Sequence, residues 1–471
     1  MTSNWPIYGR HASVEPLARP VQLAAKQSFV ITSTDSGPTS CYNNLTGETL
    51  CSLKDGKGAK LRNSIRFDLS DYLIHFFRDV DMTGPNAISM PEHLGWHSLA
   101  EDTDYPAIFM LRAALRNGRL WATWSYRNEA RTIYGPNPAV CFTDMPVAAF
   151  VEASRERHSR GEAMGEVALV FPKARMKAQG ARPGIYGLSA DLTVWPGRND
   201  GGPRVFPVAI LPLHEQYRYI TDTYPIDWSH EREWRWPCRA DYPDRGDVPI
   251  ADWSDIPGLD FYEKKIFGIG AIVKTRAQAE LVVHDMLTLV DAGMADQDFF
   301  SFVLPTDEIP SAAAIRDREA LKNALAKVTI DIDKYFAWPQ AEVDEVNRQF
   351  TDEVRAIEKS APHPQAGQSG ECWLWLHDGS SRLARLLLAG DRLSVSRNGR
   401  YLAKLGEFSD SRSLCEREAM TARLAANIQK KFGVSCGYFS VSDSSNPDDV
   451  PFNAQDHDDD IPYYNATWNY K

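Results

Sequence analysis

A charged, tryptophan-containing segment at residues 227–235 carries the carboxylates whose spacing best suits chemistry. Because side chains alternate between the faces of a β-strand, a strand here would put Glu231, Glu233 and Arg235 on one face. Glutamate is depleted in strands, and two carboxylates on one face repel unless a cation, a metal or a sugar hydroxyl holds them. The segment is therefore either a catalytic glutamate with a helper, or an exposed edge strand paired with Arg232 and Arg235.

A histidine interrupts the apolar run 72–77, which is predicted to be a strand. A lone histidine in such a strand, here His75, is more often a hydrogen-bonded core residue than a ligand-binding one. The apolar spacing over 106–118 predicts a helix with Gly118 as its C-cap. A further strand at 138–146 stops abruptly at Pro146 and leads into a helix to about residue 158. Its Cys141 has apolar neighbours, which favour an inert core thiol.

The rest of the chain alternates further strands and helices. Strands are expected at 165–171, 205–211, 265–273, 372–376, 384–389 and 436–441. Helices are expected at 275–293, 312–328 and 341–359, and a capping box starting at Ser413 predicts one more, to residue 432. We expect a loop-rich arm over 1–60, a catalytic domain over 61–330, a helix and linker over 331–368, and a small α+β domain over 369–471. The linker is inferred from the Pro-, Gly- and Ser-containing stretch 360–367.

Composition narrows the classes of protein. The chain has 471 residues, 43% of them hydrophobic, and seven cysteines without a CxxC pair. This usage suits a reducing compartment, and no apolar run reaches the length of a membrane span, so a cytoplasmic protein without a membrane contact is expected. The motifs GxGxxG, Walker A, HExxH and GxSxG are absent, and no metal site is predicted.

Charge is distributed unevenly along the chain, whose formal net charge is −11. Between residues 112 and 182 there are 12 Lys or Arg against 6 Asp or Glu. Such a stretch is either a phosphate-binding face that meets a nucleic acid or protein acceptor, or a set of solvated helix faces.

These residues resemble one branch of the ADP-ribosyltransferase superfamily, which includes the DNA-modifying toxins of the DarT type and the tRNA 2′-phosphotransferases. That branch has a strand histidine, as at His75, followed by a helix closing on Gly-Leu. Here Arg119 stands between Gly118 and Leu120. The superfamily also places a catalytic glutamate on a late strand, often as Glu-x-Glu, which residues 231–233 match. The resemblance implies an α+β fold with twisted mixed sheets and flanking helices.

Residues 65–275 are also similar to uncharacterised bacterial proteins linked with phage abortive infection. The shared segments are Leu-Ile-His-Phe, Cys-Phe-Thr-Asp/Glu-x-Pro and Glu-x-Glu-Trp-Arg. The resemblance implies a bacterial toxin or anti-phage effector that uses NAD as its substrate, modifies a nucleic acid or a protein, and has an antitoxin or defence partner. The C-terminal region resembles a domain of no known role that recurs behind such regions.

The resemblance also implies roles for particular side chains. Glu233 would stabilise the oxocarbenium-like state formed when the nicotinamide bond breaks. Glu231 would orient or deprotonate the acceptor. His75 would bind a ribose hydroxyl, and we expect it to face the same cleft as Glu233.

Four other side chains are candidates for binding the rest of NAD. Tyr186 or Tyr134 would stack on nicotinamide, and Arg78, or else Arg232, would pair with the pyrophosphate. Two alternatives stay open. One is a metal-dependent nuclease or phosphotransferase that uses the same His and Glu residues. The other is a non-catalytic phage-sensing or interaction module.

Overall fold

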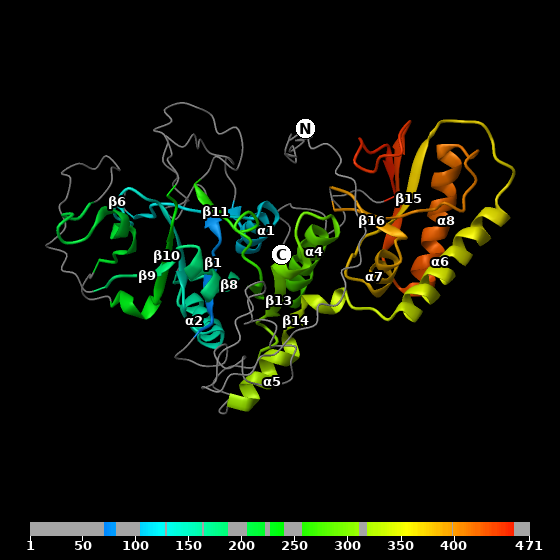
Figure 1. Cartoon of the computed structure of the whole chain (residues 1–471). Helices are drawn as coiled ribbons and strands as arrows, with labels where there is room; N and C mark the ends of the chain where they lie inside the picture. Colours follow the sequence, from blue (N-terminus) through cyan, green and yellow to red (C-terminus); the bar gives the residue numbers. More distant parts are fainter. Residues whose placement is uncertain are drawn as a thin grey trace, which may run out of the picture.

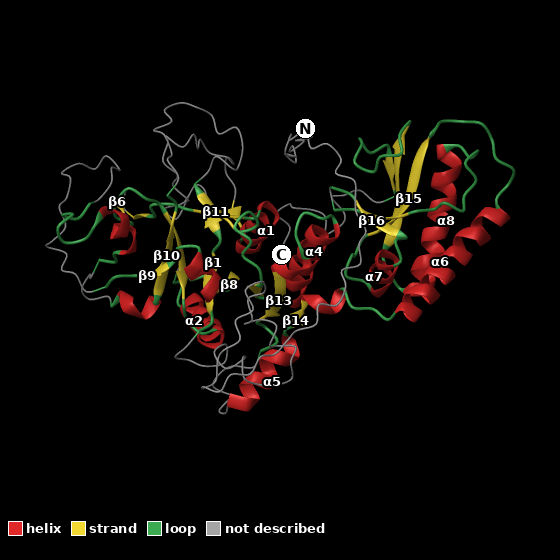
Figure 2. Ribbon diagram, in the orientation of Figure 1, coloured by secondary structure: helices red, strands yellow, loops and turns green. Residues whose placement is uncertain are grey.

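The computed structural model describes residues 70–81, 104–127, 130–162, 164–186, 205–221, 227–239, 257–309, 318–397 and 399–455. The expected arm at 1–60 lies outside these residues. The described part is α+β and forms two units, each built around a sheet with helices on it (Figures 1 and 2). We call them the sheet unit, up to Tyr335, and the C-terminal unit, from Gln340. No helix among the described residues is long and apolar enough to cross a membrane.

Eight described strands form the mixed sheet of the first unit, in the order β14-β13-β12-β8-β1-β7-β10-β9. Within it, β12 and β13 pair in parallel and the other neighbours pair antiparallel. The strands are β1 (Tyr72–Phe77), β7 (Ala139–Thr143), β8 (Val167–Pro172), β9 (Arg182–Pro183), β10 (Glu233–Pro237), β12 (Ile269–Val273), β13 (Phe300–Pro305) and β14 (Ile330–Asp331).

Helices cover both faces of this sheet. One face packs against α1 (Ala107–Asn117), α3 (Lys173–Ala178) and α4 (Arg276–Asp291), and the other against α2 (Val147–Ser159) and α5 (Arg318–Val328). Gly118 ends α1 with a left-handed φ of 66°, as its position in the sequence predicts. The expected strand-and-helix order around β1, α1, β7 and α2 is therefore confirmed.

Short elements fill the ends of the sheet unit. They are β2 (Val80–Asp81) with β3 (Asp104–Tyr105), β4 (Arg119–Trp121) with β11 (Gly258–Asp260), β5 (Tyr126–Arg127) with β6 (Ala130–Arg131), and the 3-10 helices η4 (Leu213–Arg218), η5 (Trp228–Glu231), η7 (Gln297–Phe299) and η9 (Ile332–Tyr335).

The prediction of a strand at 205–211 is wrong, because these residues mainly form turns. The Gln216 side chain binds both the amide and the carbonyl of Phe206 at 2.9 Å and so replaces a strand partner. Val208 is 58% exposed as a result.

The C-terminal unit has five described antiparallel strands in the order β16-β17-β15-β18-β19. They are β15 (Gly370–Leu376), β16 (Leu393–Val395), β17 (Tyr401–Ala403), β18 (Cys436–Ser442) and β19 (Asn453–Ala454). Three helices pack on one face, namely α6 (Gln340–Ser360), α7 (Arg382–Ala389) and α8 (Leu414–Phe432). The strand expected at 384–389 is therefore helix α7, which Ser381 caps and which buries Leu383, Leu386 and Leu387 at helical spacing.

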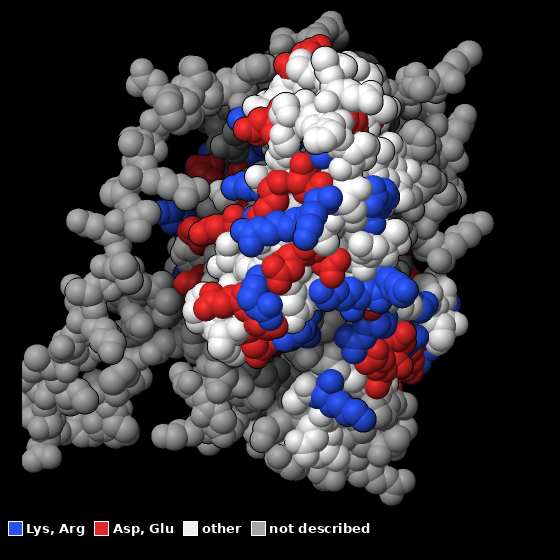
Figure 3. Space-filling view, turned by 90° about the vertical axis from the view of Figure 1, so that its right-hand side faces the viewer, with Lys and Arg blue, Asp and Glu red and all other residues white. Residues whose placement is uncertain are grey.

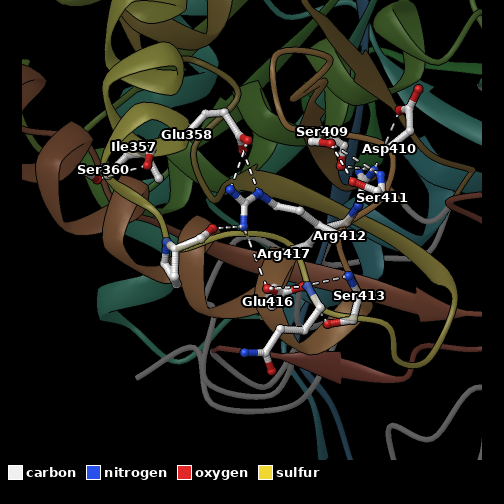
Figure 4. A network of polar contacts seen from close by, with 12 residues as sticks. Ile357, Glu358, Ser360, Ser409, Asp410, Ser411, Arg412, Ser413, Glu416 and Arg417 are labelled. Atoms are coloured by element: carbon white, nitrogen blue, oxygen red, sulfur yellow. Dashed lines mark hydrogen bonds and ion pairs between the residues drawn. The ribbon is translucent and has the colours of Figure 1, made fainter.

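The boundary between the units also differs from the expectation. Helix α6 buries Val343, Phe350 and Val354 in the same core as β15 and α8, so it belongs to the C-terminal unit and not to a separate segment before it. The stretch 361–369 is then a loop within that unit. Arg412 binds both carboxylate oxygens of Glu358 through its Nε and Nη2 (Figure 4). Its Nη1 donates to the Pro362 carbonyl at 3.1 Å and so holds the loop.

The surface of the C-terminal unit carries both signs of charge. Figure 3 shows Lys and Arg interspersed with Asp and Glu on the face that it views. On α6 and α8, ion pairs such as Arg348–Glu345 and Lys431–Glu353 account for part of this mixture. That view shows no extended surface of a single sign.

Candidate functional site

The 227–235 segment is a one-turn helix followed by a strand, so the expectation that one strand carries both glutamates is wrong. Glu231 ends η5, and β10 begins at Glu233. The Asp227 carboxylate starts η5 by accepting from the Ser229 amide at 2.9 Å. Between the glutamates, Arg232 takes a left-handed conformation with a φ of 49°, which a residue other than glycine rarely adopts. Residues in such conformations are found preferentially at functional sites.

The end of β7 holds this turn in place. The Thr143 hydroxyl donates to the Glu231 carbonyl at 2.7 Å, and the Asp144 amide donates to the Arg232 carbonyl at 3.1 Å. The Asp144 carboxylate also accepts from Arg232 Nε at 2.6 Å and from Lys173 Nζ at 2.7 Å. Burial opposes ionisation of Asp144, but Lys173 and Arg232 outweigh it and hold its pKa below the usual value.

Glu233 is the carboxylate held most firmly in the segment. Its two oxygens accept from Arg235 at 2.8 and 3.3 Å, and its backbone amide donates to the Tyr186 hydroxyl at 2.7 Å. The Glu233 side chain is 21% exposed while that of Arg235 is 5% exposed. Arg235 also donates to the carbonyls of Tyr217 and Tyr219, at 2.7 and 3.0 Å. The Glu233 carboxylate is thus partly exposed to solvent and is held in one position by the buried Arg235 guanidinium.

Two neutral groups surround this pair. Burial is the main cause that raises the pKa of Tyr186 to about 12, so its phenol keeps its proton at neutral pH. Cys141 lies opposite Arg235 in the β7–β10 pairing. Burial first, and then the charge of Glu233, raise the pKa of its thiol well above the usual value. A thiol is nucleophilic as its thiolate, so Cys141 is unsuited to be a nucleophile.

Glu231 has its own cationic neighbours. Arg157, near the end of α2, donates to the Glu231 carboxylate at 2.8 Å, and His230 Nε2 lies 3.3 Å from the same oxygen. Arg157 also binds Glu162. The pattern of the sequence did not single out Arg157 or Lys173 for the site, because 74 residues separate Arg157 from Glu231 and 29 separate Lys173 from Asp144.

His75 and Glu233 lie on opposite faces of the sheet, so the expectation of one shared cleft is not met. Strand β7 separates β1 from β10, and Ile74, Thr143 and Glu233 align across the three strands. Aligned residues point to one face and the next residues point to the other. His75 therefore points the same way as Phe142, with ring centroids 5.8 Å apart. Its Nδ1 lies 2.8 Å from the Cys141 carbonyl, and burial lowers its pKa.

The two remaining binding candidates differ in accessibility. Tyr134 is 1% exposed, packs against Phe206 and Tyr219, and forms a hydrogen bond with Thr221 at 3.0 Å. Tyr134 is thus part of the core in this structure, and its stacking on a nicotinamide stays a prediction. Arg78 follows the end of β1 and is exposed.

At least half of the 12 cations in the basic stretch 112–182 bind carboxylates or a carbonyl within the protein. The pairs include Arg112 and Arg116 with Asp285, Arg155 with the Thr306 carbonyl, Arg157 with Glu231, Arg160 with Glu156, and Lys173 with Asp144. The positive charge available to a partner at the surface is therefore smaller than the count of Lys and Arg in this stretch suggests.

A smaller basic surface remains beside α3, which we call the α3 patch: Lys177, Arg182, Lys264 and Lys265. Gln179 joins its two halves by donating to the Lys264 carbonyl at 3.2 Å, and Arg182 donates to the Lys177 carbonyl at 2.7 Å. Lys177 and Lys265 are exposed and form no ion pair with any residue in the described ranges. The exposed Glu263 beside them leaves the patch net positive.

Among the described residues, no group of three or more His, Cys, Asp or Glu side chains is arranged to hold a metal ion. Comparison with known proteins adds one match. Residues 339–466 match the family described as "Protein of unknown function (DUF4427)". This match covers less than half of the chain and begins next to the first residue of α6, in agreement with α6 as part of the C-terminal unit. No curated protein and no solved structure matches the chain.

Proposed function

We propose that the sheet unit is an NAD-dependent ADP-ribosyltransferase of the toxin or anti-phage effector kind, with Glu233 as its catalytic carboxylate. The observation that carries the proposal is the Glu233–Arg235 pair, in which a buried cation fixes a partly exposed carboxylate. Breaking the bond between nicotinamide and ribose develops positive charge on the ribose. A carboxylate already in position stabilises that charge without reorganising.

Other residues around Glu233 have supporting roles in the proposal. Tyr186 fixes the backbone at the start of β10, and its aromatic ring is half-buried beside Glu233. Glu231, held by Arg157, would orient or deprotonate the acceptor. Arg78 or Arg232 would meet the pyrophosphate. His75 points to the other face, so we assign it to positioning the Cys141 backbone and not to the ribose.

The proposal is tested by incubating the full chain with NAD and measuring release of nicotinamide. Parallel reactions with single-stranded DNA, RNA and a protein mixture identify the acceptor by its gain of one ADP-ribose. Turnover that persists in EDTA supports the proposal. Cleavage of nucleic acid that needs no NAD and stops in EDTA would favour the metal-dependent nuclease instead.

For the acceptor, the α3 patch favours a phosphate-bearing chain. Lys177→Glu with Lys265→Glu should weaken binding of a labelled single-stranded oligonucleotide by about tenfold or more and reduce its salt dependence, because two phosphate contacts are lost. Lys359→Glu, a single substitution of the same kind at an exposed position on α6, should leave binding unchanged. Equal binding by all three proteins would show that the α3 patch does not meet the acceptor.

A second candidate is a non-catalytic sensing or interaction module. It is favoured by the two hydrogen bonds from Arg235 to the carbonyls of Tyr217 and Tyr219. In that case Glu233 serves only to balance the charge of an arginine that anchors this segment. Wild-type protein that releases no nicotinamide from NAD with any of the acceptors would support this candidate.

A further inference from the structure

The two units meet at a buried ion pair at the end of α4. Asp291, the last residue of α4, accepts from Arg385 Nη2 of α7 at 3.0 Å and from the Tyr401 hydroxyl of β17 at 2.8 Å. Both side chains of the Asp291–Arg385 pair are 2% exposed. Arg385 also donates to the Tyr335 carbonyl at 2.9 Å, just before the chain enters the C-terminal unit.

The position of Asp291 makes α4 dependent on this contact. A helix carries partial negative charge at its C-terminus, so a carboxylate on the last residue is unfavourable there. The last turn of α4 contains no basic residue that could offset it. Among the described residues, the partners of Asp291 both come from the C-terminal unit. Removing one partner of a buried pair leaves a buried charge uncompensated.

The same helix is tied to the sheet unit one to two turns earlier. Asp285, also buried, accepts from Arg112 at 3.0 Å and from Arg116 at 2.7 Å, both on α1. Between the two aspartates, Thr288 lies 3.4 Å from the Tyr401 hydroxyl. One part of α4 is thus fixed within its own unit, whereas its last turn is fixed by the other unit.

We propose that Asp291, Arg385 and Tyr401 form a releasable clamp through which the C-terminal unit controls the order of the last turns of α4. When the units are docked, Asp291 is neutralised and α4 is ordered to its end. When they separate, the same carboxylate favours fraying of the last turns and of the connection 292–299 into β13. This inference does not depend on the chemistry assigned to Glu233.

The clamp is tested in the full chain by hydrogen–deuterium exchange of peptides covering 284–299. Arg385→Met keeps the apolar stem and removes the charge, and should speed exchange there by about tenfold or more, with β1 and β8 unchanged. The matched control is Arg382→Met on the same helix, because Arg382 pairs with Glu342 at the surface. It should exchange like the wild type.

A second variant separates loss of the clamp from general damage to α7. Adding Asp291→Asn to Arg385→Met removes the uncompensated charge and should return exchange of 284–299 most of the way to the wild-type rate. Wild-type exchange in Arg385→Met would overturn the proposal. Equal acceleration in all elements, or no recovery in the double variant, would overturn it as well.

Discussion

The hydroxyl of Tyr186 connects the candidate site to the backbone that carries it. The Glu233 amide donates to this oxygen, so the start of β10 depends on a side chain from another segment. A backbone amide left without a partner in a half-buried position costs free energy comparable to a lost hydrogen bond. The precision with which Glu233 is held is therefore expected to depend on one phenol.

Tyr186→Phe should lower the free energy of unfolding by about 1–2 kcal/mol, because the Glu233 amide loses its acceptor. Urea titration followed by circular dichroism measures the change. Tyr335→Phe is the control, since the Tyr335 hydroxyl has no hydrogen bond to a residue that the structure describes. A loss in Tyr186→Phe no larger than that in the control would mean that water replaces the phenol at no cost.

At the scale of elements, the sequence was sufficient to predict a helix where residues at its ends are typical of helix caps. The capping box at Ser413 and the glycine at 118 correctly predicted α8 and the end of α1. The helix expected at 275–293 is α4, which the structure shows to begin with a capping box at Thr275. Apolar runs without such signals were misjudged at 205–211 and 384–389. The first lacks a strand neighbour because Gln216 satisfies its backbone, and the second packs its leucines at helical spacing.

The candidate site was harder to predict than the helices, because the contacts that shape it join residues that are distant in sequence. The Glu-x-Glu pattern identified the correct segment, but not the left-handed turn at Arg232 that separates the two carboxylates. That turn is stabilised by Thr143 and Asp144, which are distant in sequence. Nor could the face to which His75 points relative to Glu233 be predicted, because it depends on the register of three strands.

The buried His284 of α4 should make stability depend on pH. Burial is the main cause that lowers its pKa from 6.5 to about 3, so the folded chain keeps it neutral while the unfolded chain protonates it below about pH 6.5. The unfolded state then binds more protons, and stability falls as pH decreases from about 6.5 towards 3. The full effect is on the order of 5 kcal/mol.

Urea titrations at several pH values measure this dependence. His284→Phe keeps a ring against Tyr401 and should flatten the slope between about pH 6.5 and pH 4.5. An identical slope in the variant and the wild type would show that other groups cause the acid destabilisation.

At the scale of the whole molecule, the division of the chain follows the cores and not the flexible-looking stretch at 360–367. Helix α6 supplies one side of the C-terminal core, and the loop that follows it is held by Arg412 and Glu416 (Figure 4). The units are joined by residues 336–339 and by the clamp at Asp291.

A fragment of residues 336–471 should therefore fold cooperatively, whereas a fragment of residues 369–471 should not, because it lacks the buried face of α6. Urea titration of each fragment, followed by far-ultraviolet circular dichroism, compares them. Cooperative unfolding of the shorter fragment with the same midpoint would contradict this division of the chain.

The central claim is that Glu233 is a catalytic carboxylate, and Glu233→Gln tests it most directly through nicotinamide release from NAD. Gln keeps the shape of the side chain but loses the charge that would offset the developing cation, so the rate should fall by about 10²–10³. Glu407→Gln is the matched control, because Glu407 is likewise a partly exposed glutamate that binds an arginine through both oxygens. It should keep the wild-type rate. Wild-type turnover in Glu233→Gln, with the fold intact, would contradict the assignment.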